Sequence, residues 1–272
     1  MTAKQTKKAF SYPTVGKEID NAITHGIGGG LAVAGTVLLI VKSVAYGAKG
    51  VVGACLYGAA LIILYTASCI YHALAPNGAK HVFRILDHCS IFVLIFGTYI
   101  PAAWMLFGDA LGWSIFGVIG GAAALGITLN AIDLVRFDRI SQILYLVMGW
   151  AIALTCPIVY RAVGLDGMLF LIGGGVAYTA GVFFFRRERG FDHAIWHFFV
   201  LGGSVLHYFF IYLYCYSRLD KRVRDGCEGA HPSLTFGAKV WIVCCENPPG
   251  GQYDSARKSH CSACRSGKRE PW

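Results

Sequence analysis

Charged residues are scarce in this chain of 272 residues, since Lys, Arg, Asp and Glu together supply only 14% of it. A typical soluble domain carries about 25% charged residues, so there is too little polar side-chain surface here to cover a soluble domain of this length. Hydrophobic residues instead make up 56% of the chain and gather in long runs. The composition therefore indicates a membrane protein and excludes an ordinary soluble enzyme.

Seven apolar runs are long enough to cross a bilayer, which takes roughly 20 residues as a helix. The runs lack the alternation of barrel strands, so we predict an all-α fold, a seven-transmembrane-helix bundle joined by short linkers. No cleavable signal is expected before the first run, and Gly26 and Gly30 within it predict a close-packing helix face. The runs cover about residues 22–41, 50–71, 86–107, 112–132, 140–160, 166–185 and 193–214.

The orientation of the bundle follows from lysine and arginine in its loops, which accumulate on the cytoplasmic side. With a cytoplasmic N-terminus, eleven of these residues lie inside and three outside. We therefore predict a multi-pass protein of the cell (inner or plasma) membrane with its N-terminus in the cytoplasm and its C-terminus outside. The inner residues are Lys4, Lys7, Lys8, Lys17, Lys80, Arg84, Arg136, Arg139, Arg186, Arg187 and Arg189, and the outer ones are Lys42, Lys49 and Arg161.

Ionisable residues at the cytoplasmic ends of these segments are costly near hydrocarbon and point to function. His193 and His197 are four residues apart, so they share a helix face. Ser68 and His72 have the same spacing on another segment. Three imidazoles, from His72, His193 and His197, would leave one tetrahedral position of a zinc ion for water, as in catalytic sites. Asp87 and Ser68 would then lie around that water, and Asp87 would accept its proton or that of a ligating histidine.

Each of these residues also has a structural explanation. His72 alone could be an interfacial residue, and Asp87 could pair with Arg84 or cap the start of its helix. A pair of histidines four residues apart on a helix can also be structural. His207 lies roughly 15 Å along the last segment from His197 and is too distant for the same ion.

Four short motifs begin near the cytoplasmic ends of the apolar segments: Glu18-x-x-Asn21-x-x-Thr24-His25-Gly26, Ser68-Cys69-Ile70-Tyr71-His72, Asp87-His88-Cys89-Ser90-Ile91-Phe92 leading to Gly97-Thr98-Tyr99-Ile100-Pro101, and His193-x-x-x-His197. As a set, over residues 14–216, they resemble the hemolysin III family. This is the bacterial branch of the progestin and adipoQ receptor superfamily, which includes the adiponectin receptors and is related to the alkaline ceramidases.

The resemblance implies a seven-helix bundle with a cytoplasmic N-terminus and a zinc ion in the inner leaflet. It places the metal on His72, His193 and His197, with Asp87 and Ser68 around the bound water. Glu18, Asn21 and His25 match a family motif whose role is less defined.

For function, the resemblance implies a part in membrane lipid homeostasis, and the eukaryotic relatives suggest zinc-dependent hydrolysis of lipid amides or esters, with Asp87 as general base. Expected partners are membrane lipids or an acyl-chain substrate, and no nucleic acid. Two alternatives stay open at this point. One is a lipid or fluidity sensor or receptor in which zinc only braces the helices, and the other is a membrane-lysing, haemolytic pore former.

The chain divides into two parts at about residue 217. We expect residues 1–217 to form the seven-helix domain. Residues 218–272 are polar and basic, contain five of the ten cysteines, and depart from the family pattern. We predict that this tail is disordered or is non-native sequence.

Overall fold

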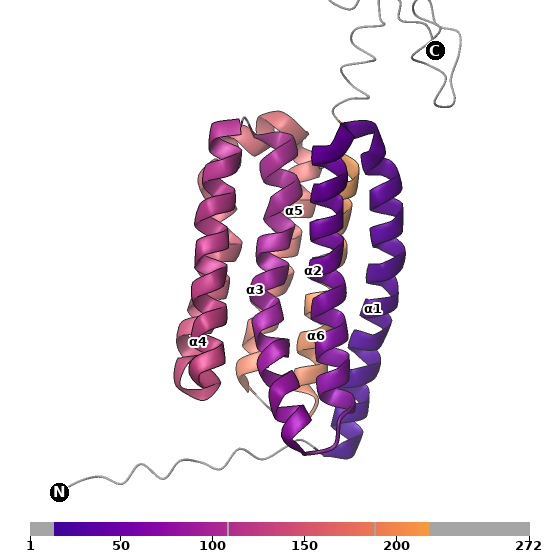
Figure 1. The fold of residues 1–272 in the computed structure, drawn as a ribbon, viewed down its shortest axis with the longest axis vertical. Coiled ribbons are helices and arrows are strands. Elements are labelled where there is room, and N and C mark those ends of the chain that lie inside the picture. The colour runs from indigo at the N-terminus through magenta and orange to yellow at the C-terminus, as the bar shows by residue number, and fades with distance from the viewer. Residues whose placement is uncertain (1–13, 108, 188, 218–272) are drawn as a thin grey trace, which may run out of the picture. The chain divides into compact units, whose positions relative to one another are not determined.

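The computed structural model describes residues 14–107, 109–187 and 189–217, so the predicted tail lies outside the described residues. Within these ranges the chain is built of helices and holds no strand, which confirms the all-α prediction. Short turns of 3₁₀ helix, η1 (Val44–Tyr46) and η2 (Ala151–Thr155), and a π-helix, η3 (Ile211–Cys215), adjoin the long helices. The long helices, seen in Figure 1, are α1 (Val15–Ser43), α2 (Gly47–Ala73), α3 (Gly78–Leu106), α4 (Asp109–Trp150), α5 (Cys156–Arg187) and α6 (Asp192–Phe210).

Two of the long helices contain a break in the backbone. In α4 the break lies at Asp133, with φ −159° and ψ 95°. The Ser141 hydroxyl donates to Asn130 Oδ1 at 2.6 Å, whereas residues 11 apart in an unbroken helix would be roughly 16 Å apart. The chain therefore reverses at Asp133. In α5 the break lies at Gly164, whose φ of 71° is a backbone conformation that glycine adopts readily.

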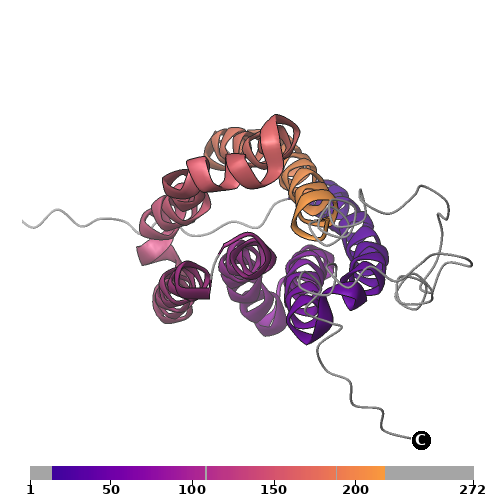
Figure 2. The same ribbon diagram turned by 90° about the horizontal axis from the view of Figure 1, so that it is seen from above.

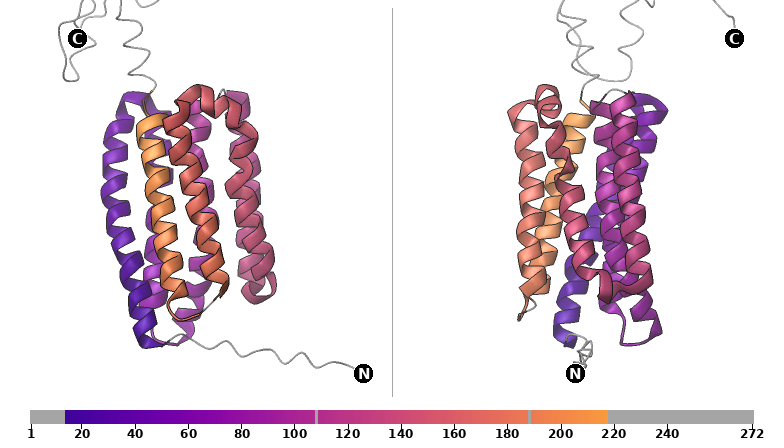
Figure 3. Two further views of the ribbon diagram at one scale, coloured as in Figure 1. Left: turned by 180° about the vertical axis from the view of Figure 1, so that it is seen from behind. Right: turned by 90° about the vertical axis from the view of Figure 1, so that its left-hand side faces the viewer.

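The first and last helices lie side by side. Helix α1 packs against α2 and α6, α2 packs against α3, and α3 packs against α4. The view along the helix axes shows this order (Figure 2), and the view from behind places α6 between α1 and α5 (Figure 3). Hydrogen bonds join α1 to α6 and η3: Lys42 Nζ donates to the Tyr212 carbonyl at 2.5 Å, and the Tyr208 hydroxyl donates to the Gly35 carbonyl at 2.9 Å. Residues far apart in the sequence can therefore meet in one site.

Helix α1 exposes a row of apolar side chains and buries three polar ones on another face. Glu18, Asn21 and His25, spaced three and four residues apart, are buried. This arrangement is the reverse of that in a soluble protein, and it fits a helix surrounded by lipid, because hydrocarbon favours apolar side chains and excludes ionisable ones. The outer face carries Ile19, Ile23, Ile27 and Leu31, each more than half exposed.

Among the described residues, four helical stretches are long and apolar enough to cross a membrane by length and composition: Val15–Ala73, Gly78–Leu106, Ala110–Arg187 and Asp192–Cys215. This supports the prediction of a membrane protein. Two of these stretches contain more than one helix: Val15–Ala73 contains α1 and α2, and Ala110–Arg187 contains most of α4 and all of α5.

The close-packing face predicted on α1 is centred on a different glycine. A Cβ atom at Gly28 would lie 2.5 Å from Tyr65 Cδ1 of α2, so only glycine lets the two helices approach there. At Gly26 a Cβ would lie 3.4 Å from Cys69 Sγ, a tight but possible contact, while Gly30 has no heavy atom within 4 Å. The predicted role therefore belongs to Gly28 and not to Gly30.

Candidate metal centre

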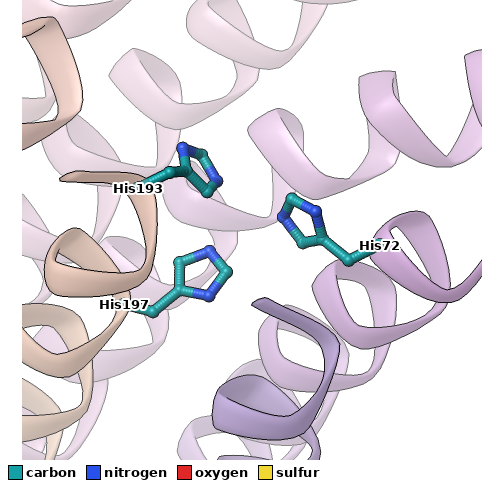
Figure 4. Close-up of side chains that lie close together, drawn as sticks. All are labelled: His72, His193 and His197. Carbon is teal, nitrogen blue, oxygen red and sulfur yellow. The ribbon is translucent and has the colours of Figure 1, made fainter. Parts of the chain in front are cut away.

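Three histidines from two helices far apart in the sequence come together at one end of the bundle. His72 lies at the end of α2, and His193 and His197 lie in the first two turns of α6. Their ring centroids are between 4.7 and 5.1 Å apart, and one ring nitrogen from each lies within 4.8 Å of the others. Figure 4 shows the rings around a shared space. This group, the histidine triad, could hold a metal ion.

Two rings of the triad are held through their Nδ1 atoms by side chains of α1. His72 Nδ1 lies 2.5 Å from Glu18 Oε2, and His197 Nδ1 lies 3.0 Å from Thr24 Oγ1. The Thr24 hydroxyl donates its proton to the Asn21 carbonyl at 2.9 Å, so Oγ1 is the acceptor toward the ring. Histidines that bind metals commonly donate the second ring N–H to such an oxygen. Both rings therefore keep Nε2 for a ligand.

The residues present fit a metal ion. His72 Nε2 is buried and has no hydrogen-bond partner in the part of the chain that the structure describes, although buried polar atoms are normally paired. Imidazole nitrogen is a common ligand of divalent transition metals. Donors around a tetrahedral ion, with metal–nitrogen distances of about 2.0 Å, are roughly 3.3 Å apart. Shifts of the side chains of about 1.5 Å at most would bring the nitrogens to that spacing.

Glu18 connects the triad to a buried lysine. Lys80 Nζ lies 3.0 Å from Glu18 Oε1 and donates to the carbonyls of Tyr71 and Leu74 at 2.8 and 2.9 Å. The Lys80 side chain, counted above among the loop cations, is instead fully buried. Its ammonium group ties the first turn of α3 to the end of α2, the helix that carries His72. Glu18 thus joins α1, α2 and α3 directly behind the triad.

The start of α6 is fixed by the residue before His193. Asp192 is buried, and its Oδ2 accepts hydrogen bonds from Arg187 Nε at 2.8 Å and from the Arg189 backbone N–H at 3.0 Å. A carboxylate in the first turn also suits the positive end of the helix dipole. These contacts begin the helix at Asp192, so His193 and His197 project from its first two turns.

A largely apolar cavity of about 130 Å³ opens beside the triad. Asp87, Ser68, His193 and His197 line one end of it, and His207 lies further along, 14 residues after His193 on α6 or about 21 Å away. Ser68 is fully buried and its hydroxyl has no hydrogen-bond partner among the described residues. The structure thus brings Asp87 and Ser68 to the same cavity as two triad histidines.

Sequence reasoning considered Asp87 for the contact to a ligating histidine, and in the structure Glu18 makes that contact. Asp87 Oδ2 lies 3.8 Å from His88 Nδ1, on the residue that follows it in α3. A signal for Glu18 was present in the sequence, since Glu18, Asn21 and His25 fall on one face of a largely apolar helix. His207 is separate from the triad, as predicted, and its Nε2 lies 3.0 Å from the Leu171 carbonyl oxygen.

Comparison with known proteins gives one consistent family. A family model described as Haemolysin-III related matches residues 14–208. The chain is 37% identical to Hemolysin-3 of Bacillus cereus over 216 residues, which cover 79% of this chain and 97% of that protein. It is 36% identical to the Hemolysin-3 homolog of Bacillus subtilis (strain 168) over 204 residues, covering 74% and 96%. It is also 27% identical to the human Monocyte to macrophage differentiation factor over 174 residues, covering 59% and 69%.

Proposed function

This chain belongs to the haemolysin III-related family, and we propose that it is a multi-pass membrane protein that uses zinc to hydrolyse an amide or ester bond of a membrane lipid. One observation carries the proposal: His193 and His197 of the histidine triad line one end of a largely apolar cavity, together with Asp87 and Ser68. Such an enzyme would act in membrane lipid homeostasis.

We further propose seven spans, with the N-terminus in the cytoplasm and the C-terminus outside. The support is that turns and backbone breaks divide the described helices into seven segments of 17 or more residues, about the length a span requires. The triad then lies at the cytoplasmic side, because α1 begins and α2 ends there. The proposed segments are 15–43, 47–73, 78–106, 109–132, 134–150, 165–187 and 192–215.

The chemistry requires a metal, a base and a dry site. Zinc held by the triad would supply Lewis acidity toward an acyl carbonyl and activate a water molecule. Asp87, on the wall of the same cavity, would accept the proton of that water, and Ser68 would orient the water through its unused hydroxyl. Glu18 and Thr24 hold the His72 and His197 rings in one orientation. The apolar walls would exclude bulk water and receive the acyl chain.

The test combines metal analysis with a lipid hydrolysis assay on purified protein in lipid nanodiscs. We expect the wild type to hold one zinc per chain and to release fatty acid from a lipid amide or ester. His197→Ala should lose both zinc and turnover. Asp87→Asn should keep zinc and lose turnover by about 10²–10⁴-fold, the usual contribution of a general base. His81→Ala, which changes an exposed histidine of α3, should match the wild type in both measurements.

The outcomes separate the parts of the proposal. A wild-type protein that stays free of zinc when supplied with it would remove the metal site. Zinc retained without turnover on any acyl lipid would remove the hydrolase and leave a protein braced by zinc, as a sensor or receptor would be.

A further inference from the structure

His25 of α1 lies against the triad without belonging to it. Its ring stacks on the His197 ring, with centroids 3.5 Å apart and planes at 14°. Tyr65 of α2 makes a T-shaped contact with it, with centroids 5.1 Å apart and planes at 89°. The side chain is 3% exposed. Held by these two rings, the imidazole has little freedom to turn.

The hydrogen-bonding capacity of His25 is unused. Neither Nδ1 nor Nε2 has a hydrogen-bond partner among the described residues, although a neutral imidazole carries one N–H donor and one acceptor. Leaving a buried donor unpaired is costly, so such a group usually serves a ligand or an ordered water. The metal-binding group comprises the three triad residues and does not include His25. An ion at the triad therefore does not account for the His25 nitrogens.

The surroundings of His25 suggest what it binds. His25 lines the internal cavity together with Ser68, another buried group with an unused hydrogen bond. Beyond this end, the cavity wall is mainly aliphatic and aromatic, including Leu64, Ile95 and Val200. A ligand that fits both parts has an apolar chain and an oxygen-bearing group at one end.

We propose that His25 donates a hydrogen bond to the acyl oxygen of a lipid in this cavity, either the carbonyl oxygen of an amide or ester substrate or the carboxylate of the fatty acid product. The inference rests on the proposed function and adds a residue that contacts the substrate. The donor is set in place before the ligand arrives, and a preorganised donor beside a reacting carbonyl stabilises the charge that develops on its oxygen. The neutral imidazole suffices for this role, so no change of protonation is involved.

The test uses His25→Phe, which keeps an aromatic ring to stack on His197 and removes both nitrogens. The probe is palmitate, titrated by calorimetry into zinc-loaded protein in nanodiscs. Loss of a hydrogen bond to the charged carboxylate should raise the Kd of His25→Phe for palmitate about tenfold or more. Zinc content should stay at the wild-type level. His25→Gln, whose amide N–H can replace the ring donor, should recover part of the affinity.

Ile27→Ala, which alters a lipid-facing side chain of the same helix, is the matched control and should bind palmitate as the wild type does. Equal palmitate affinity in the wild type and His25→Phe would overturn the inference, because it would mean that His25 serves only an ordered water. That result would leave the hydrolase intact. Loss of zinc in His25→Phe would also overturn it, by showing that the ring only supports His197. A wild type that neither binds palmitate nor turns over lipid would remove the proposed function together with this inference.

Discussion

The contact between Glu18 and His72 predicts how zinc affinity depends on a residue that does not bind the metal. Glu18→Gln keeps the size of the side chain and one acceptor oxygen but removes the charge that faces His72 Nδ1 at 2.5 Å. Replacing a group of this kind behind a metal ligand typically weakens metal binding 10–100-fold. That range corresponds to about 1.4–2.7 kcal/mol. We therefore expect the Kd for zinc to rise by this factor.

Glu18→Gln should also change the stability of the metal-free protein, because Glu18 forms a buried ion pair with Lys80. The Lys80 and Glu18 side chains are only 1% and 11% exposed, and the ammonium nitrogen lies 3.0 Å from Glu18 Oε1. Removing one partner of a buried ion pair costs about 3–5 kcal/mol, while replacing both by neutral groups is often tolerated. Glu18→Gln should therefore lower thermal stability, and adding Lys80→Met should restore part of it. Zinc affinity should stay low in the double variant, because the contact to His72 is still changed.

Zinc affinity is measured by competition with a chromophoric chelator, and stability by thermal unfolding of the metal-free protein. Asp20→Asn is the control, since Asp20 is an exposed carboxylate two residues along the same helix. Zinc binding by Glu18→Gln within twofold of the wild type would refute the claim that this carboxylate orients His72. A double variant less stable than either single variant would refute the ion-pair argument.

Two further predictions concern packing and topology. Gly28→Ala should destabilise the protein by about 1–3 kcal/mol in thermal unfolding, because the new Cβ would lie 2.5 Å from Tyr65. Gly30→Ala is the control and should have little effect, since no heavy atom lies within 4 Å there. Equal destabilisation by the two substitutions would contradict the packing of α1 against α2 at Gly28. In a cysteine-free background, Lys49→Cys should react with a membrane-impermeant maleimide added to intact cells. Arg136→Cys should react only after the membrane is opened. The opposite labelling pattern would reverse the proposed orientation.

The helices were predictable because a lipid-facing helix must satisfy its backbone internally over the whole apolar thickness. The length of an apolar run is then a strong signal. The ends of the helices were less predictable where turns are also apolar. The run 140–160 was expected as one helix, but α4 ends at Trp150 and η2 follows over Ala151–Thr155. A loop expected after residue 132 is a single non-helical residue, Asp133.

The triad was predictable and its surroundings were not. The spacing of His193 and His197 is a local property of one helix, and the predicted order of antiparallel helices brings the end of α2 close to the start of α6. The contacts of Glu18 with His72, of Thr24 with His197, and of His25 with His197 depend on which helices α1 packs against. The local pattern shows which face of α1 is buried, but it carries no information about the partner helix.

In the proposed zinc site, the position of α1 would make metal binding and helix packing interdependent. The triad joins α2 to α6, and α1 contacts both of those ligating helices through Glu18 and Thr24. Ligands that meet only when α2 and α6 are packed together would bind metal only in the folded state, so the binding free energy would add to the folding free energy. At free zinc of about 1000 times Kd this amounts to roughly 4 kcal/mol. A change at the start of α1 should therefore alter both metal affinity and the stability gained from metal, even though α1 supplies no ligand.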